Sequence, residues 1–128
     1  MFGKGYNELS SHAYAFVETS AVGGTHPALL EAMAFGSCVV VNDTAENLET
    51  IGDTGFSYSG KVGAPSLLLV LRDILSRTEA VELSRSKAKS RALSVYSWEK
   101  VVDSYERLFF NLLKLPIPER LRDSLRSV

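Results

Sequence analysis

One short loop and the helix after it hold the residues whose types and spacing could do chemistry. Gly23, Gly24, Thr25 and His26 stand directly before an apolar segment that contains one carboxylate, Glu31. Unpaired backbone N–H groups and the dipole at the amino end of a helix attract anions such as a diphosphate. Glycines let the backbone approach a ligand closely. Residues 22–26, the glycine loop, therefore indicate an anion site, although adjacent glycines are equally typical of a tight turn.

Glu31 extends this hypothesis from an anion to a nucleotide. Side chains on a helix lean toward its amino end and Glu31 lies one turn after Pro27, so we expect the carboxylate to point toward the glycine loop. A carboxylate accepts two hydrogen bonds from a vicinal diol, which suits a ribose whose diphosphate lies at the loop. A solvated helix glutamate is the more common situation for this residue type. The apolar segment "LLEAMAF" around Glu31 favours binding.

Four polar residues have two interpretations each, and a fifth has one. At a helix start the dipole disfavours a protonated His26, so we interpret it as a neutral binder or as a simple polar cap. Glu18 is either a second carboxylate for the site or a surface residue. Asn42 and Asp43 either line a cleft at a strand end or cap the next helix. His12, at a helix end, is expected to be structural.

Composition and charge exclude several classes of function. The 128 residues, 45% hydrophobic and 23% charged, are ordinary for one globular domain. A net charge of −1 gives no electrostatic footprint for nucleic acid. The single cysteine, Cys38, cannot form an internal disulfide, which fits a reducing cytoplasm. No acidic pair is spaced for Mg²⁺, so no metal site and no cofactor are expected. The apolar runs are too short to cross a bilayer, so we expect a soluble protein.

The first half of the chain alternates between strand and helix patterns. We expect a short helix over residues 7–12, a strand over 13–19, and a helix of about ten residues that Thr25 caps and Gly36 ends. The run "CVVVND", residues 38–43, is apolar on both faces, which is typical of a strand with helices on both sides. A short helix opened by Asp43 with Glu46 follows and ends at Gly52, and "GFSYSG" is a third strand.

The second half of the chain is helical. Apolar residues follow helical spacing from Leu67 to Leu75 and again from Val101 to Leu112, and a polar segment that is mostly helix-forming joins the two. Pro116 and Pro118 break the tail, which we expect to be loosely attached. We therefore predict a domain over residues 1–113 and a tail over 114–128.

This order of elements predicts the fold class α/β, with a Rossmann-like open parallel sheet and flanking helices. Ligands of such sheets bind outside the carboxyl ends of the strands. Three strands make a small sheet, so the chain is either a fragment or completes its sheet with a partner.

Three segments together resemble a known family. "GGTHPALLEAMAFGSCVVVND" resembles the donor-binding signature of retaining GT-B glycosyltransferases of the group 1 type. "YSWEKVVDSYERLF" is similar to the aromatic helix that closes their C-terminal domain, and "GKGYNELSSHAYAFV" to the helix and strand before the signature. The resemblance covers residues 3–113. It implies a partial GT-B C-terminal domain that binds a nucleoside diphosphate sugar.

The resemblance also assigns roles to single residues. Glu31 matches the second glutamate of the family's pair, which binds the nucleotide ribose, whereas the first glutamate would fall at Gly23. The form "VGGTHP" is more similar to a branch that includes rhamnosyltransferases. In that branch the amides of Gly24 and Thr25 face the donor phosphates and His26 lies near the sugar. The implied donor site is therefore Gly23, Gly24, Thr25, His26 and Glu31, with catalytic residues unknown.

The function that follows is the donor-binding portion of an enzyme of polysaccharide biosynthesis. Such an enzyme transfers a sugar to a glycan or lipid-linked acceptor, in the cytoplasm or at the inner face of the membrane. The portion alone is expected to be inactive, since a separate N-terminal domain or a second copy would have to complete the cleft. One alternative is a noncatalytic Rossmann-like interaction module or remnant subunit. Another is a domain for a different small anion, without preference for a nucleoside.

Overall fold

The computed structural model describes residues 3–22 and 24–123. These residues form two compact units, Met1–Leu93 and Ser94–Val128, and each is described by itself. The first unit contains the sheet and the candidate site. The domain boundary that we predict at residue 113 stays a prediction.

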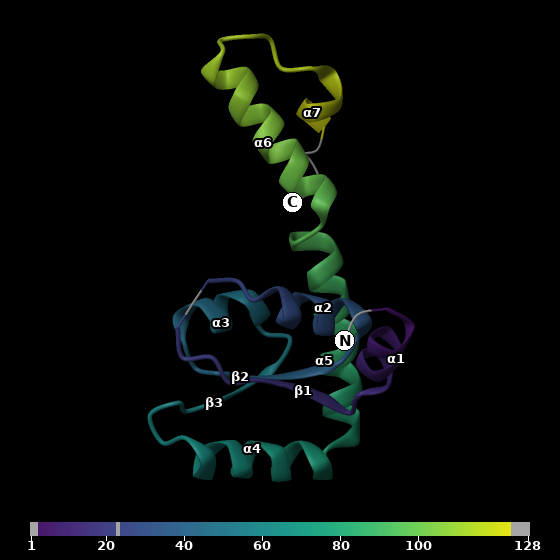
Figure 1. Cartoon of the computed structure of the whole chain (residues 1–128), viewed down its shortest axis with the longest axis vertical. Coiled ribbons are helices and arrows are strands. Elements are labelled where there is room, and N and C mark those ends of the chain that lie inside the picture. Colours follow the sequence, from purple (N-terminus) through teal and green to yellow (C-terminus); the bar gives the residue numbers. More distant parts are fainter. Residues whose placement is uncertain (1–2, 23, 124–128) are drawn as a thin grey trace. The chain divides into compact units, whose positions relative to one another are not determined.

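The sheet of the first unit has three parallel strands in the order β1-β2-β3. They are β1 (Ala15–Glu18), β2 (Cys38–Asn42) and β3 (Phe56–Tyr58). Val40 in the central strand pairs with Val17 on one side and with Phe56 on the other. Helices lie on both faces of this sheet (Figure 1), which confirms the predicted α/β Rossmann-like class.

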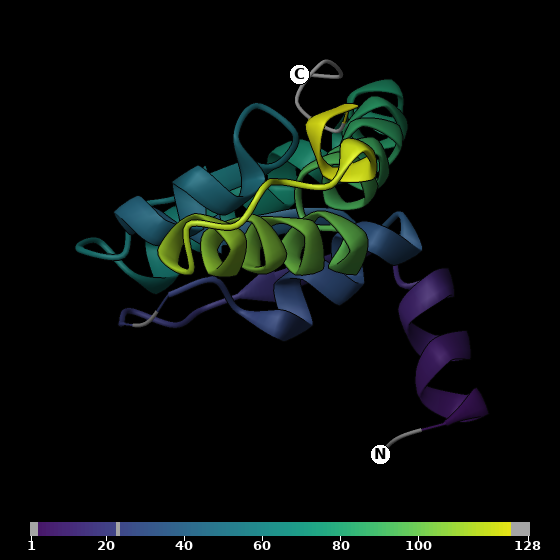
Figure 2. The same cartoon turned by 90° about the horizontal axis from the view of Figure 1, so that it is seen from above.

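The helices of the first unit follow the predicted order with shifted ends. The short first helix is one turn longer than expected. The helices are α1 (Lys4–His12), α2 (Pro27–Phe35), α3 (Ala45–Ile51), α4 (Ala64–Ser76) and α5 (Thr78–Val95). Figure 2, seen from above, shows α2 and α3 over the sheet and α1 at the side of α2. The last residues of α5 belong to the second unit.

The central strand divides the core into two parts because all five of its residues are buried. Val39 and Val41 point to one face, where they meet α2, α3 and α5. Cys38 and Val40 point to the other face, where Tyr58, Ile74 and Val81 cover them. The strand is therefore apolar throughout for the reason that we predicted, namely that helices cover both of its faces.

Two predicted helix caps are wrong by one residue. Pro27 occupies the first turn of α2, so the residue before it, His26, is the N-cap and Thr25 lies outside the helix. In α3 the hydroxyl of Thr44, and not the carboxylate of Asp43, accepts from the N–H of Asn47 at 3.3 Å. Both helices end as predicted, at Gly36 and at Gly52, each with a positive φ.

The second unit consists of the end of α5, then α6 (Trp98–Leu112) and α7 (Glu119–Asp123). The loose attachment of the tail stays a prediction. In its described part, Arg120 pairs with Glu106 at 2.6 Å and with Asp103 at 3.8 Å, both in α6, and Leu121 is fully buried. Residues 124–128 lie outside the described part.

None of the helices in the described part of the chain is both long enough and apolar enough to cross a membrane.

The two-sided core predicts that truncating a buried side chain of α2 lowers the free energy of unfolding. Leu29 has no exposed surface, and Leu29→Ala should lower the free energy of unfolding by about 2–5 kcal/mol through lost burial and a cavity. Leu69→Ala on α4 is the control, since Leu69 is 67% exposed and its truncation should change stability by less than about 0.5 kcal/mol. Urea unfolding of both variants measures the difference. Equal effects would contradict the assignment of Leu29 to the core.

Candidate functional site

The glycine loop lies where the fold class predicts a ligand site, between the carboxyl end of β1 and the amino end of α2. Val22, Gly24 and Thr25 are exposed, and a side-chain carbon added at Gly24 would meet no heavy atom within 4 Å. Open space therefore adjoins this backbone. Gly23, which we also predict to bind the donor, lies outside the described residues.

His26 connects the glycine loop to α2 through its backbone. Its carbonyl oxygen accepts from the N–H groups of Leu29 and Leu30, both at 3.1 Å, while its side chain makes no capping hydrogen bond. The imidazole is therefore not needed to cap the helix. Of its two interpretations, the cap holds for the position of His26 but not for its side chain, and a role as binder stays a prediction.

Glu18 closes the turn that starts the loop. One carboxylate oxygen accepts from the backbone N–H of Ser20 at 2.9 Å. Desolvation by burial raises the pKa of Glu18, but hydrogen bonds from Ser20 and Thr19 and the electrostatic influence of His26 outweigh it, so the pKa lies below its ordinary value. Glu18 is therefore a half-buried carboxylate with a local partner, and it lies near His26.

Two buried asparagine side chains hold the start of the loop in place. The amide nitrogens of Asn42 and Asn47 both donate to the carbonyl oxygen of Ser20, at 3.2 and 3.4 Å. Asn47 also donates to the backbone oxygen of Asn42 at 3.2 Å. These bonds join the ends of β1 and β2 to α3, so Asn42 is a buried support and does not line an open cleft.

Asp43 reaches the third strand and does not cap a helix. Its carboxylate accepts from the N–H of Gly60 at 2.9 Å, and its own N–H donates to the oxygen of Tyr58 at 3.0 Å. Asp43 is exposed at the carboxyl edge of the sheet. His12 is structural as expected, because its Nδ1 lies 2.8 Å from the backbone oxygen of Glu8 in the same helix.

Glu31 is exposed in the middle of α2, and its one polar partner among the described residues is on another helix. The hydroxyl of Tyr6, in α1, donates to Glu31 Oε2 at 2.6 Å. This hydrogen bond raises the pKa of the Tyr6 hydroxyl. The structure thus brings Glu31 to Tyr6, and the predicted approach of its carboxylate to the glycine loop stays untested.

Sequence reasoning missed two residues of this region, Tyr6 and Asn47. A polar Asn47 on a short amphipathic helix, one turn before buried Ile51, was a usable signal for an inward-facing amide. Tyr6 gave no signal, because its contact with Glu31 spans 25 positions.

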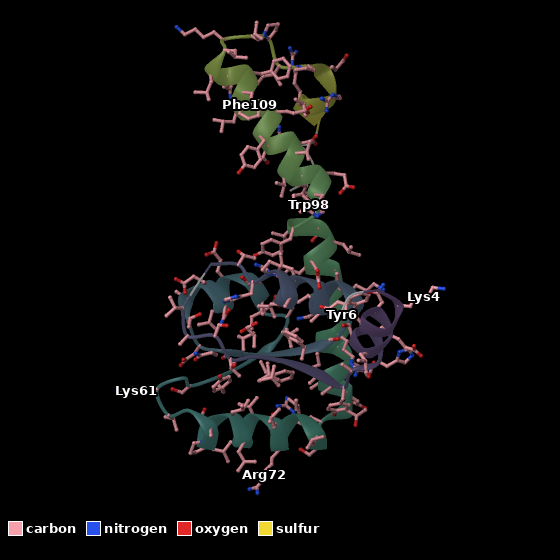
Figure 3. The ribbon with its side chains drawn as sticks, viewed as in Figure 1. Lys4, Tyr6, Lys61, Arg72, Trp98 and Phe109 are labelled. Carbon is pink, nitrogen blue, oxygen red and sulfur yellow. The ribbon has the colours of Figure 1, made fainter. Side chains whose placement is uncertain are left out.

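The side chains of the described residues form no candidate group for a metal ion. No three His, Cys, Asp or Glu side chains in residues 3–22 and 24–123 gather into a metal-binding group. Figure 3 shows Lys4 extending outward from α1 and Arg72 pointing away from the sheet on α4. At the amino end of α2, backbone N–H groups and the helix dipole are the features that can attract an anion.

Glu18 generates a prediction about pH. A carboxylate whose pKa is lowered in the folded state adds stability above its unfolded pKa and loses it as the pH falls through the folded value. Glu18→Gln should therefore unfold at a lower urea concentration than the wild type at pH 7, and the difference should shrink below about pH 4.5. Glu8→Gln, an exposed change in α1, is the control. A difference that is constant from pH 7 to pH 3 would refute the ionic role of Glu18.

Comparison with known proteins supports the architecture. No family model matches the chain, and no curated protein matches it. Among solved structures, sucrose-phosphate synthase from Thermosynechococcus elongatus is similar over 77% of this chain, with a TM-score of 0.69 and 20% sequence identity. The chain spans about a quarter, 25%, of that structure's length. It therefore has an open parallel α/β fold of the Rossmann-like kind that matches a domain of a GT-B glycosyltransferase.

Proposed function

We propose that this chain is the donor-binding portion of a glycosyltransferase that uses a nucleoside diphosphate sugar. The main support is that Gly24 and Thr25 are exposed at the amino end of α2, the helix that also bears Glu31. The fold is also similar to part of a glycosyltransferase. The name sucrose-phosphate synthase describes the reaction of that protein and not of this chain. Donor binding by this chain is the proposal.

The diphosphate would bind at the glycine loop. The N–H groups of Gly24 and Thr25, together with the first turn of α2, supply hydrogen-bond donors and a positive partial charge. Glu18 would repel an anion near His26, because its carboxylate, whose pKa is lowered, carries a negative charge there. The donor would therefore approach over Gly24, where the backbone is open.

The ribose would bind at Glu31. Tyr6 occupies one lone pair of Oε2, so the carboxylate keeps acceptor capacity on both oxygens for two neighbouring hydroxyls. His26 would donate one hydrogen bond to the sugar. The acceptor would be a glycan or a lipid-linked saccharide.

Transfer itself would need residues beyond this chain. Stabilising the leaving diphosphate and positioning an acceptor both require groups that face the loop. Lys4 and Arg72 do not point toward it (Figure 3). We therefore propose that this portion binds the donor without turning it over, and that a further domain or a second copy completes the cleft.

One set of observations favours the alternative of a noncatalytic interaction module. β1 is an edge strand of the sheet, and an edge strand can pair with another chain. Helix α6 also leaves Trp98 79% and Phe109 55% exposed (Figure 3). Both features fit association with another polypeptide, and neither requires a nucleotide.

Thermal unfolding with UDP, GDP, ADP, dTDP and inorganic pyrophosphate tests the proposal. A ligand at about a hundred times its dissociation constant adds roughly 2.7 kcal/mol to stability, a shift of several degrees for a domain of this size. We expect one nucleotide to raise the unfolding temperature and pyrophosphate to do so weakly or not at all. A pyrophosphate shift equal to the best nucleotide shift would favour an unspecific anion site, and the absence of any shift would favour the interaction module.

Glu31→Gln tests the ribose role directly. The variant keeps the shape of the side chain but loses its charge, so it should raise the dissociation constant of the best ribonucleotide about tenfold or more without unfolding the domain. Binding of dTDP, which has only one of the two hydroxyls, should suffer less. Glu49→Gln, an exposed change on α3, is the control. Unchanged ribonucleotide binding together with a large loss of stability would make Glu31 a structural residue.

A further inference from the structure

A contact between two helices fixes the carboxylate that the proposed function assigns to the ribose. Tyr6 Oη lies 2.6 Å from Glu31 Oε2, although the residues are 25 positions apart. Both side chains reach the surface, since Glu31 is exposed and Tyr6 is half-buried. Figure 3 shows Tyr6 on the side of α1 that faces the rest of the first unit, while Lys4 on the same helix extends outward.

The contact does not depend on one surface hydrogen bond alone. Helix α1 is attached at a second point, where the hydroxyl of Ser37 donates to the backbone oxygen of Ser10 at 2.9 Å. Ser37 is buried directly after α2 and before β2. Helix α1 is therefore held beside both the middle and the end of α2, and the Tyr6 hydroxyl stays within reach of Glu31.

Tyr6 restricts Glu31 without blocking it. A free glutamate side chain on a helix samples several rotamers, and ordering it costs binding free energy. A short hydrogen bond from a phenol to a carboxylate is charge-assisted and so holds one rotamer. The bond uses one lone pair of Oε2, and the remaining lone pairs of both oxygens stay free for a vicinal diol.

We propose that Tyr6 is a positioning residue that prepares the Glu31 carboxylate for the ribose hydroxyls of the donor nucleotide. This inference rests on the proposed function. It gives α1, which lies outside the glycine loop in the sequence, a part in recognising the nucleoside. Selectivity for a ribose over a bare diphosphate would then depend on two helices, α1 and α2.

The test compares Tyr6→Phe with Tyr14→Phe for binding of the nucleotide that gives the largest thermal shift. Tyr6→Phe removes the hydroxyl and should raise that dissociation constant about three- to tenfold, with no change for its 2′,3′-dideoxy analogue. Tyr14→Phe removes a comparable hydroxyl bond, to the backbone oxygen of Ile74 at 2.9 Å, and should leave nucleotide binding unchanged. Urea unfolding checks that both variants fold.

A double variant separates positioning from an independent effect. In the Glu31→Gln background, Tyr6→Phe should cause no further loss of binding, because it acts through the carboxylate. Unchanged or tighter binding by the single Tyr6→Phe variant would overturn the inference, and so would losses that add fully in the double variant. If Glu31→Gln weakens binding and Tyr6→Phe does not, only this inference fails. If the wild type binds none of the nucleotides, the proposed function fails and the inference falls with it.

Discussion

Burial of β2 on both faces is the constraint from which the rest of the first unit follows. Its four apolar residues, 38–41, have no exposed surface and must have apolar partners above and below the sheet. Helices α2 and α3 pack on one side through Leu29 and Ile51, and α4 packs on the other through Ile74. Each strand must then be followed by a crossing helix, which leaves the strand-to-helix loops at one edge of the sheet.

The same constraint explains the polar chemistry at that edge. Where β2 ends, its last side chain is still buried, and a buried amide needs hydrogen-bond partners. Asn42 and Asn47 find the carbonyl oxygen of Ser20 and so hold the first residues after β1. These hydrogen bonds hold Ser20, which lies close in sequence to the exposed residues Val22, Gly24 and Thr25.

The donor-binding proposal and the proposed role of Tyr6 concern the two ends of one ligand, its diphosphate and its nucleoside. The loop supplies generic attraction for a phosphate, which many helix amino ends share. Discrimination for a nucleoside has to come from a group with directional acceptors, and Glu31 is such a group on the same helix. The hydrogen bond from Tyr6 connects Glu31 to α1.

The sequence by itself determined the order of elements, the parallel sheet and the place of the glycine loop, because these depend on local periodicity and on Gly and Pro. The N-caps predicted for α2 and α3 are each one residue before the observed ones. Neighbouring polar residues such as Thr25 and His26 can both serve as an N-cap, so the sequence alone does not decide between them. Only the tertiary structure decided that Asn47 supports the loop, that the tail contacts α6, and that Tyr6 meets Glu31. Those contacts join residues far apart in the chain, and no periodic pattern in a single sequence records which distant side chains the packing of helices brings within hydrogen-bond distance.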